Sequence, residues 1–153
     1  MSNEIAAIEQ TLAAYCHRVD RGSAAEVASL FAEDAILKPN YDGQYEVVGR
    51  DAIQGWYAYY HEHFRAGVRH LKHMIMSALI EVDGDSAQSV SYLLASAVSN
   101  ETNEGFYVTG TYHDTLVKLG GAWLFEMRQI DVDFMAPQPA AVEQFPPLGY
   151  PHD

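Results

Sequence analysis

The carboxylate of Asp20 is a group in this sequence that a purely structural role explains poorly. Asp20 lies in the segment YCHRVDRGS (residues 15–23), four residues after Cys16, so it projects near the buried face at the end of a predicted helix. An ionised carboxylate is costly to bury, and the negative end of the helix dipole adds to that cost. Asp20 could be a turn or cap residue, but Ser23 and Glu26 already have the spacing of a capping box for the next helix. We therefore expect Asp20 to have a compensating polar partner.

A histidine would be a suitable partner, and the segment VRHLKHMIM (residues 68–76) contains His70 and His73. Side chains alternate along a strand, so only one of the two should face the interior unless a bulge intervenes. Neutral histidine is a competent base near pH 7, and a carboxylate on its second ring nitrogen fixes the tautomer and stabilises the imidazolium. The residue types thus indicate proton abstraction by an Asp–His pair. A hydrogen-bonded structural histidine is the alternative.

Other reactive residue types point away from metal or thiol chemistry. His61 and His63 are two residues apart on a predicted helix and do not share a face, whereas a metal site needs three or four convergent ligands. We expect neither a metal nor another cofactor. Cys16 is the single cysteine, which excludes an internal disulfide, and its apolar surroundings predict a small buried side chain rather than a nucleophile.

The apolar spacing along the chain predicts the elements that must position these residues. Apolar residues at three- and four-residue steps predict helices over residues 5–20, 24–31 and 50–64. Short strands are predicted over 35–39 and 45–49, and long strands over 68–82, 87–99, 106–119 and 122–134. Asp83–Gly84 and Gly120–Gly121 are hairpin turns. Helices segregated to one side of an antiparallel sheet define an α+β domain, and a sheet curved around helices leaves a cavity where function should be sought.

Length and charge limit the class of protein and its partners. The chain has 153 residues, which suits one domain over residues 1–134, and its formal net charge is -12. An acidic surface repels phosphate backbones and anionic lipid, so we expect neither nucleic acid nor a membrane as partner. The sequence has no signal-peptide pattern and no apolar run of about 18 residues, which predicts a cytoplasmic protein.

Residues 135–153 form a proline-rich tail that contains five of the six prolines. We expect this tail to lack regular structure, because proline disrupts both helices and central strands. It is either a disordered terminus or a lid that folds over the cavity, with Phe145 as its apolar anchor.

The order of the predicted elements resembles the SnoaL-like branch of the nuclear transport factor 2-like superfamily. The resemblance covers about residues 4–134 and is carried by YCHRVDRGSAAEVASLFAEDAILK, GRDAIQGWY, RHLKHMIMSALIEVDGDSA, SYLLA, GTYHDTLVKLGGAW and RQIDVDF. It implies a cone-shaped α+β barrel, with three N-terminal helices packed in a strongly curved, mainly antiparallel sheet. At the chemical positions the chain is most similar to scytalone dehydratase, bile-acid 7α-dehydratase and hexachlorocyclohexane dehydrochlorinase, lyases with an Asp–His pair in the cavity.

The resemblance also implies roles for particular residues. The aspartate after the first helix corresponds to Asp20, and the histidine near the start of the long third strand corresponds to His70, which it favours over His73 as the base. Substrate-binding residues are implied at the tyrosines Tyr15 and Tyr41. The resemblance further places Tyr112 at a cavity position.

Two further residues are candidates for the cavity wall. Trp56 belongs to an aromatic set on the third predicted helix, most of which should be core and part of which should line the pocket. Arg128 corresponds to an inward position on the last strand. An arginine there must either be paired with an acid, such as Asp114, or meet a ligand anion.

These features predict a small cofactor-independent lyase of dehydratase type. His70 would abstract a proton from a hydrophobic, cyclic substrate such as a steroid or polyketide. An isomerase or polyketide cyclase that uses the same base is the nearest alternative. A non-catalytic binding or partner subunit, like the small subunit of ring-hydroxylating dioxygenases, is the other. The resemblance implies a homodimer or homotrimer.

Overall fold

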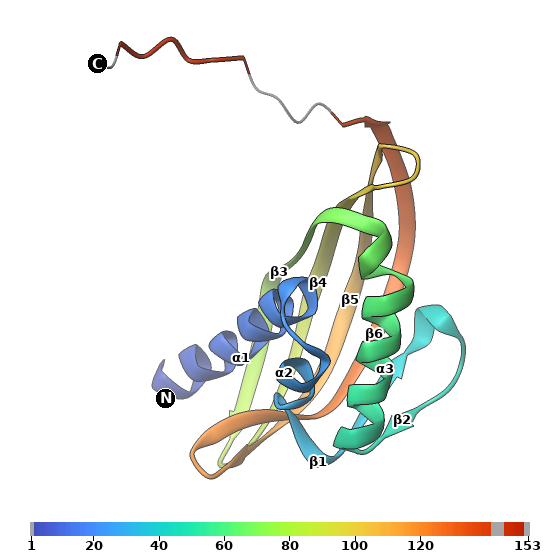
Figure 1. The fold of residues 1–153 in the computed structure, drawn as a ribbon. Coiled ribbons are helices and arrows are strands. Elements are labelled where there is room, and N and C mark those ends of the chain that lie inside the picture. Colours follow the sequence, from blue (N-terminus) through green and yellow to red (C-terminus); the bar gives the residue numbers. More distant parts are fainter. Residues whose placement is uncertain (1, 142–145, 152–153) are drawn as a thin grey trace.

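The computed structural model describes residues 2–141 and 146–151 and shows helices gathered on one side of a curved sheet (Figure 1). The helices are α1 (Ser2–Arg21), α2 (Ala24–Ala28) and α3 (Arg50–His63), with short 3-10 turns η1 (Asn40–Asp42) and η2 (Arg65–Gly67). The strands are β1 (Phe31–Pro39), β2 (Val47–Val48), β3 (Val68–Asp83), β4 (Ser86–Ser99), β5 (Glu104–Leu119) and β6 (Ala122–Ala140). This is the cone-shaped α+β fold expected from the sequence.

The six strands form one unclosed mixed sheet in the order β2-β1-β6-β5-β4-β3. The four long strands β3 to β6 follow one another as an antiparallel meander, as the two hairpin turns predicted. β1 is the exception, because it lies parallel to β6 and so joins the N-terminal part of the chain to the last strand.

α1 lies across the inner face of the sheet and is fixed to it at its N-terminal end. Its buried face includes Ile8 and Leu12, and the Thr11 hydroxyl donates a hydrogen bond of 2.9 Å to the Trp123 carbonyl. The Glu4 carboxylate accepts hydrogen bonds from the Trp123 indole at 2.6 Å and from Lys118 at 2.8 Å. The predicted capping box of α2, between Ser23 and Glu26, is present. α1 therefore packs against the β5–β6 hairpin as well as against β3.

Two bulges in β3 decide which of its side chains face the helices. The pairing of β3 with β4 shifts between Arg69 and Lys72 and again between Met76 and Leu79. At these two places His70 and Ser77 have positive φ angles of 58° and 53°. Each shift inserts one extra residue into β3 and thereby reverses the face to which the following side chains point.

The structure corrects the prediction that residues 135–153 lack regular structure. β6 continues to Ala140 and includes Pro137 and Pro139, while residues 146–151 are without helix or strand and project away from the body (Figure 1). β1 pairs with β6 only as far as Ile130, so beyond that point β6 is an edge strand. An edge strand tolerates proline, because one of its sides needs no hydrogen-bond donors. Phe145, the predicted lid anchor, lies outside the described residues.

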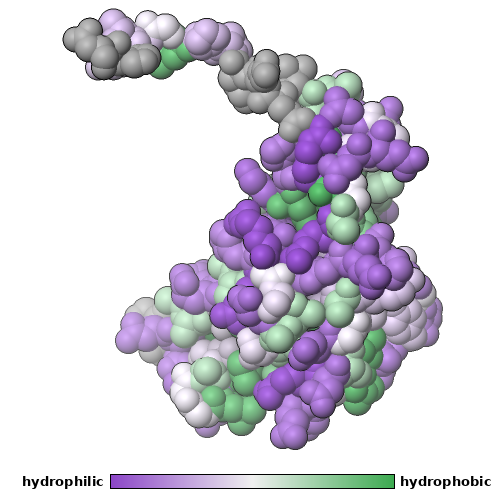
Figure 2. Space-filling view, viewed as in Figure 1, coloured by the Kyte–Doolittle hydropathy of each residue, from purple (hydrophilic) through white to green (hydrophobic). Residues whose placement is uncertain are grey.

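The visible surface of the protein is mostly polar. Figure 2 shows one face that is mostly hydrophilic, with hydrophobic side chains gathered chiefly toward the lower end of the body. Among the described residues, no helix is both long and apolar enough to cross a membrane.

Candidate active site

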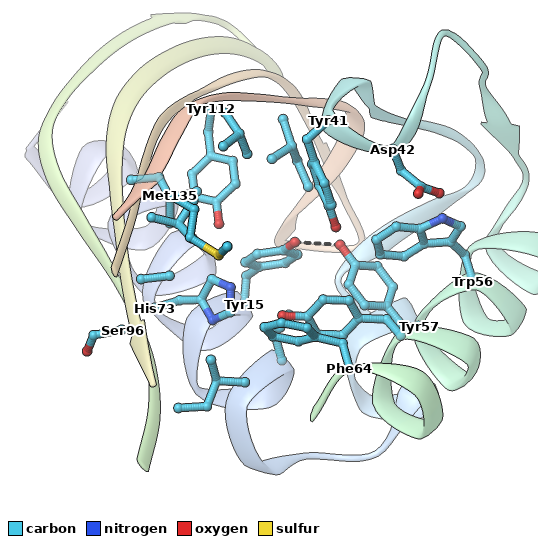
Figure 3. Close-up of a pocket in the computed structure, with 18 of the residues that line it drawn as sticks. Tyr15, Tyr41, Asp42, Trp56, Tyr57, Phe64, His73, Ser96, Tyr112 and Met135 are labelled. Atoms are coloured by element: carbon cyan, nitrogen blue, oxygen red, sulfur yellow. Dashed lines mark hydrogen bonds between the residues drawn. The ribbon is translucent and has the colours of Figure 1, made fainter. Parts of the chain in front are cut away.

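A cavity of about 430 Å³ lies between the helices and the inner face of the sheet. Most of its wall is apolar or aromatic, with side chains from α1, η1, α3 and strands β3 to β6 (Figure 3). Tyrosine is the commonest residue in the wall, at positions 15, 41, 57, 59, 60 and 112. A cavity of this size and character suits a small hydrophobic ligand that is oriented by a few polar groups.

One polar pair at the edge of this cavity joins Asp20 to His73. The Asp20 Oδ1 atom lies 2.6 Å from His73 Nδ1, and both side chains are largely buried, at 4% and 11% exposed. The His73 backbone N–H also donates to the same carboxylate, at 3.0 Å to Oδ2 and 3.2 Å to Oδ1. The carboxylate therefore fixes both the backbone and the ring of His73. The buried Asp20 thus has the polar partner that the sequence required.

The histidine that pairs with Asp20 is not the one that the sequence analysis favoured. His70 is exposed and borders a separate pocket with Leu94 and Tyr107, whereas His73 lines the main cavity. The bulge at His70 reverses the facing of the strand, so that the inward set is Leu71, His73 and Ile75. The sequence contained a signal for this outcome, because the cationic Lys72 must face solvent and its two neighbours therefore face inward.

With Nδ1 held by Asp20, the Nε2 atom of His73 is the nitrogen left for a ligand. It makes no hydrogen bond with any described residue, and Figure 3 shows the ring beside the cavity, facing the tyrosines. An Asp–His pair in this arrangement holds the imidazole in one tautomer and stabilises its positive charge after it accepts a proton.

The deepest tyrosines supply hydrogen-bond donors opposite this base. The hydroxyls of Tyr15 and Tyr57 lie 2.5 Å apart, and both side chains are buried. The Tyr112 hydroxyl points into the same space and makes no hydrogen bond with a described residue (Figure 3). Burial raises the pKa of Tyr15 to about 12, although Arg128 opposes the shift, and burial also raises the pKa of Tyr57 and Tyr112 well above the usual value for a phenol. All three phenols are therefore protonated donors at neutral pH.

The predicted substrate-binding residues divide into two groups. Tyr15, Tyr41, Trp56 and Tyr112 all line the cavity. Tyr57 also lines the cavity, and the sequence analysis did not single it out as a site residue. Its part in the hydroxyl pair depends on how α3 crosses α1, which the spacing of apolar residues does not encode.

Arg128 does not line the cavity, so the prediction that it binds substrate is wrong. Its guanidinium is fully buried and donates two hydrogen bonds to Asp114, from Nε at 2.8 Å and from Nη2 at 2.7 Å. The rings of Tyr15, Tyr112 and Phe125 surround it, with their centroids 4.1, 4.0 and 4.2 Å from its central carbon. The salt bridge that the sequence left open as an alternative is therefore present. Arg128 supports the tyrosine rings from behind and offers no charge to a ligand anion.

No group of three or more potential metal ligands occurs among residues 2–141 and 146–151. The side chains of this site have the types needed for proton transfer, at His73, and for hydrogen bonding, at the phenols.

Several solved structures share this architecture. A protein from Novosphingobium aromaticivorans, assigned provisionally as a scytalone dehydratase, is 26% identical and covers 99% of this chain and 100% of its own, with a TM-score of 0.75. A Mycobacterium tuberculosis protein of unknown function is 25% identical and covers 87% of this chain and 78% of its own, with a TM-score of 0.74. A type 2 hexachlorocyclohexane dehydrochlorinase shares the fold at 19% identity. The match covers 96% of this chain and 95% of the other, with a TM-score of 0.74. A search of curated proteins gives no significant match.

The curved sheet, the three helices packed against it and the cavity between them are consistent with the nuclear transport factor 2-like class of protein. Within that class the chain belongs to the SnoaL-like domain family, whose sequence model matches residues 1–129.

Proposed function

We propose that this protein is a cofactor-independent lyase of dehydratase type that acts on a small hydrophobic, cyclic hydroxy-ketone. The observation that carries the proposal is the contact of 2.6 Å between Asp20 and His73 at the wall of a largely apolar cavity. A carboxylate–imidazole pair is a general base, and an apolar cavity removes the water that would compete with it.

The reaction can be written with the side chains present. His73 Nε2 takes a proton from the carbon next to the substrate carbonyl, and the electron pair of the broken C–H bond is delocalised as an enolate. The Tyr15–Tyr57 hydroxyl pair donates a hydrogen bond to the carbonyl oxygen and stabilises this negative charge. The C–O bond at the β-carbon then breaks, a C=C bond forms, and the hydroxide leaves as water with the proton held on His73. Asp20 stays ionised and keeps the imidazolium in place.

Names of structural neighbours support the reaction class. The Novosphingobium protein, at 26% identity, carries the name of a dehydratase. The open cavity also argues against the non-catalytic partner subunit, for which we would expect core side chains to fill this space.

A panel of cyclic β-hydroxy-ketones tests the proposal, because elimination of water creates a conjugated enone that absorbs in the near ultraviolet. We expect the protein to accelerate this change for at least one polycyclic member, with a product lighter by one water in mass spectrometry. A product of unchanged mass would show that the protein is an isomerase or cyclase rather than a lyase. Binding of panel members without any chemical change would favour the binding subunit.

A further inference from the structure

We propose that the rim of the cavity around Asp42 binds a positively charged nitrogen on the ligand, an ammonium or quaternary ammonium group attached to the hydrophobic body. This proposal rests on the proposed function only in that the ligand occupies the same cavity. The reaction itself does not require the positive charge on the ligand.

Aromatic faces form most of this rim. The indole of Trp56 stacks on Tyr60, with ring centroids 5.7 Å apart and an angle of 14° between the planes. The Tyr41 ring meets Trp56 edge-on, at 6.4 Å and 81°. Tyr41 and Tyr59 line the cavity although they are 45% and 65% exposed, so they mark its opening. The face of an aromatic ring carries partial negative charge and attracts a cation within about 6 Å.

A carboxylate stands beside these rings. Asp42 also lines the cavity, next to Trp56 in Figure 3. The Tyr45 hydroxyl donates a hydrogen bond to Asp42 Oδ2, and the Trp56 indole N–H donates to the Tyr45 hydroxyl at 2.9 Å. This chain of hydrogen bonds holds the carboxylate close to the indole. The Asp42 Oδ1 atom has no hydrogen-bond partner among the described residues and is available to a ligand.

Among the described residues, the positive side chains near this rim have other partners, as Arg65 does in the Val19 and Gly22 carbonyls. The described residues that line the cavity include no lysine and no arginine. Arg128 is enclosed behind the tyrosines and paired with Asp114. Lys38 is not among the lining residues and lies 3.5 Å from Glu46. The formal net charge of -12 adds a field that concentrates cations near the opening.

A purely structural role for Asp42 would be to fix the η1 turn through Tyr45. The substitution Asp42→Asn separates the two roles, because asparagine keeps an oxygen acceptor for the Tyr45 hydroxyl and removes only the charge. Asp34→Asn is the matched control, since Asp34 is an exposed aspartate that does not line the cavity and its substitution changes the net charge equally.

The test compares two probes that differ only at one atom, 3-hydroxybenzyltrimethylammonium and 3-neopentylphenol, in which carbon replaces the charged nitrogen. Binding is measured by calorimetry and by tryptophan fluorescence, to which Trp56 in the rim contributes. We expect the wild-type protein to bind the cation about tenfold more tightly than its neutral isostere. Asp42→Asn should lower that ratio to about threefold or less, while Asp34→Asn should leave it unchanged.

Equal wild-type affinity for the two probes, or a ratio that Asp42→Asn and Asp34→Asn change alike, would overturn the proposal. The variant His73→Gln separates this test from that of the lyase reaction. It removes the proposed base, yet the cation preference should persist in it. The cation subsite can therefore fail while the reaction stands, and the reverse also holds.

Discussion

At the scale of single residues, the position of Asp20 depends on one residue of β3. Its carboxylate receives the backbone N–H and the ring nitrogen of His73, so the residue lies in the interior with three hydrogen-bonding contacts. The sequence predicted that Asp20 would need such a partner. The resemblance favoured His70 over His73, and the outward-facing Lys72 was a weak local signal against that choice, because a bulge with positive φ at a histidine has no distinctive sequence signature.

The change Asp20→Asn tests the role of this carboxylate. An amide can accept the His73 backbone N–H, but it cannot stabilise the imidazolium, so turnover of the identified substrate should fall by about 100-fold or more. The circular dichroism spectrum should stay native. Unchanged turnover in a folded Asp20→Asn protein would remove Asp20 from the mechanism.

At the scale of elements, β5 and β6 share an ion pair that lies behind the cavity wall. Asp114 and Arg128 are opposite each other in the strand pairing, and both are buried. The meander and its hairpins were predictable, since turn residues and apolar runs are local signals. The sequence could not show that Arg128 lies behind the cavity wall. Its position depends on rings from α1, β5 and β6 that meet around its guanidinium.

The substitution Arg128→Leu should destabilise the fold strongly, because it leaves Asp114 buried without a partner. We expect a loss of about 3–5 kcal/mol in the free energy of unfolding measured with urea. The double variant Arg128→Leu/Asp114→Leu should recover most of this loss, since it removes both charges. A single variant that costs less than about 1 kcal/mol would mean that the pair is not the structural element proposed here.

At the scale of the whole molecule, the buried tyrosines should make the folded protein less stable at alkaline pH. Burial raises the pKa of Tyr15 from 10.0 to about 12, so the folded protein holds this proton more tightly than the unfolded chain. The resulting stability is complete below pH 10 and is lost as the pH rises through about 12. The pKa values of Tyr57 and Tyr112 are raised in the same direction.

An alkaline titration should therefore show two classes of tyrosine. The first class should ionise while the circular dichroism stays native, and the buried set should ionise only at higher pH, together with cooperative unfolding. Ionisation of all ten tyrosines near pH 10 in a folded protein would contradict the buried arrangement.

The side of the sheet that faces away from the helices carries exposed apolar residues on neighbouring strands. Met76 pairs with Tyr92 and Leu79 pairs with Val90 across β3 and β4, and these four side chains are exposed. We expect this patch to be covered in a homodimer or homotrimer, because such contiguous apolar surface is unusual on a monomer. Tyr92→Glu should shift the mass measured by light scattering toward the monomer. A wild-type protein that is monomeric at high concentration would refute this expectation.

The proposed mechanism depends most directly on which histidine is the base. The decisive measurement is kcat/KM for the dehydration reaction in two matched variants, His73→Gln and His70→Gln. Because His73 lines the cavity and pairs with Asp20, we predict a loss of about 100-fold or more for His73→Gln, and a value within about twofold of wild type for His70→Gln. Full activity in a folded His73→Gln protein, or an equal loss in His70→Gln, would contradict it.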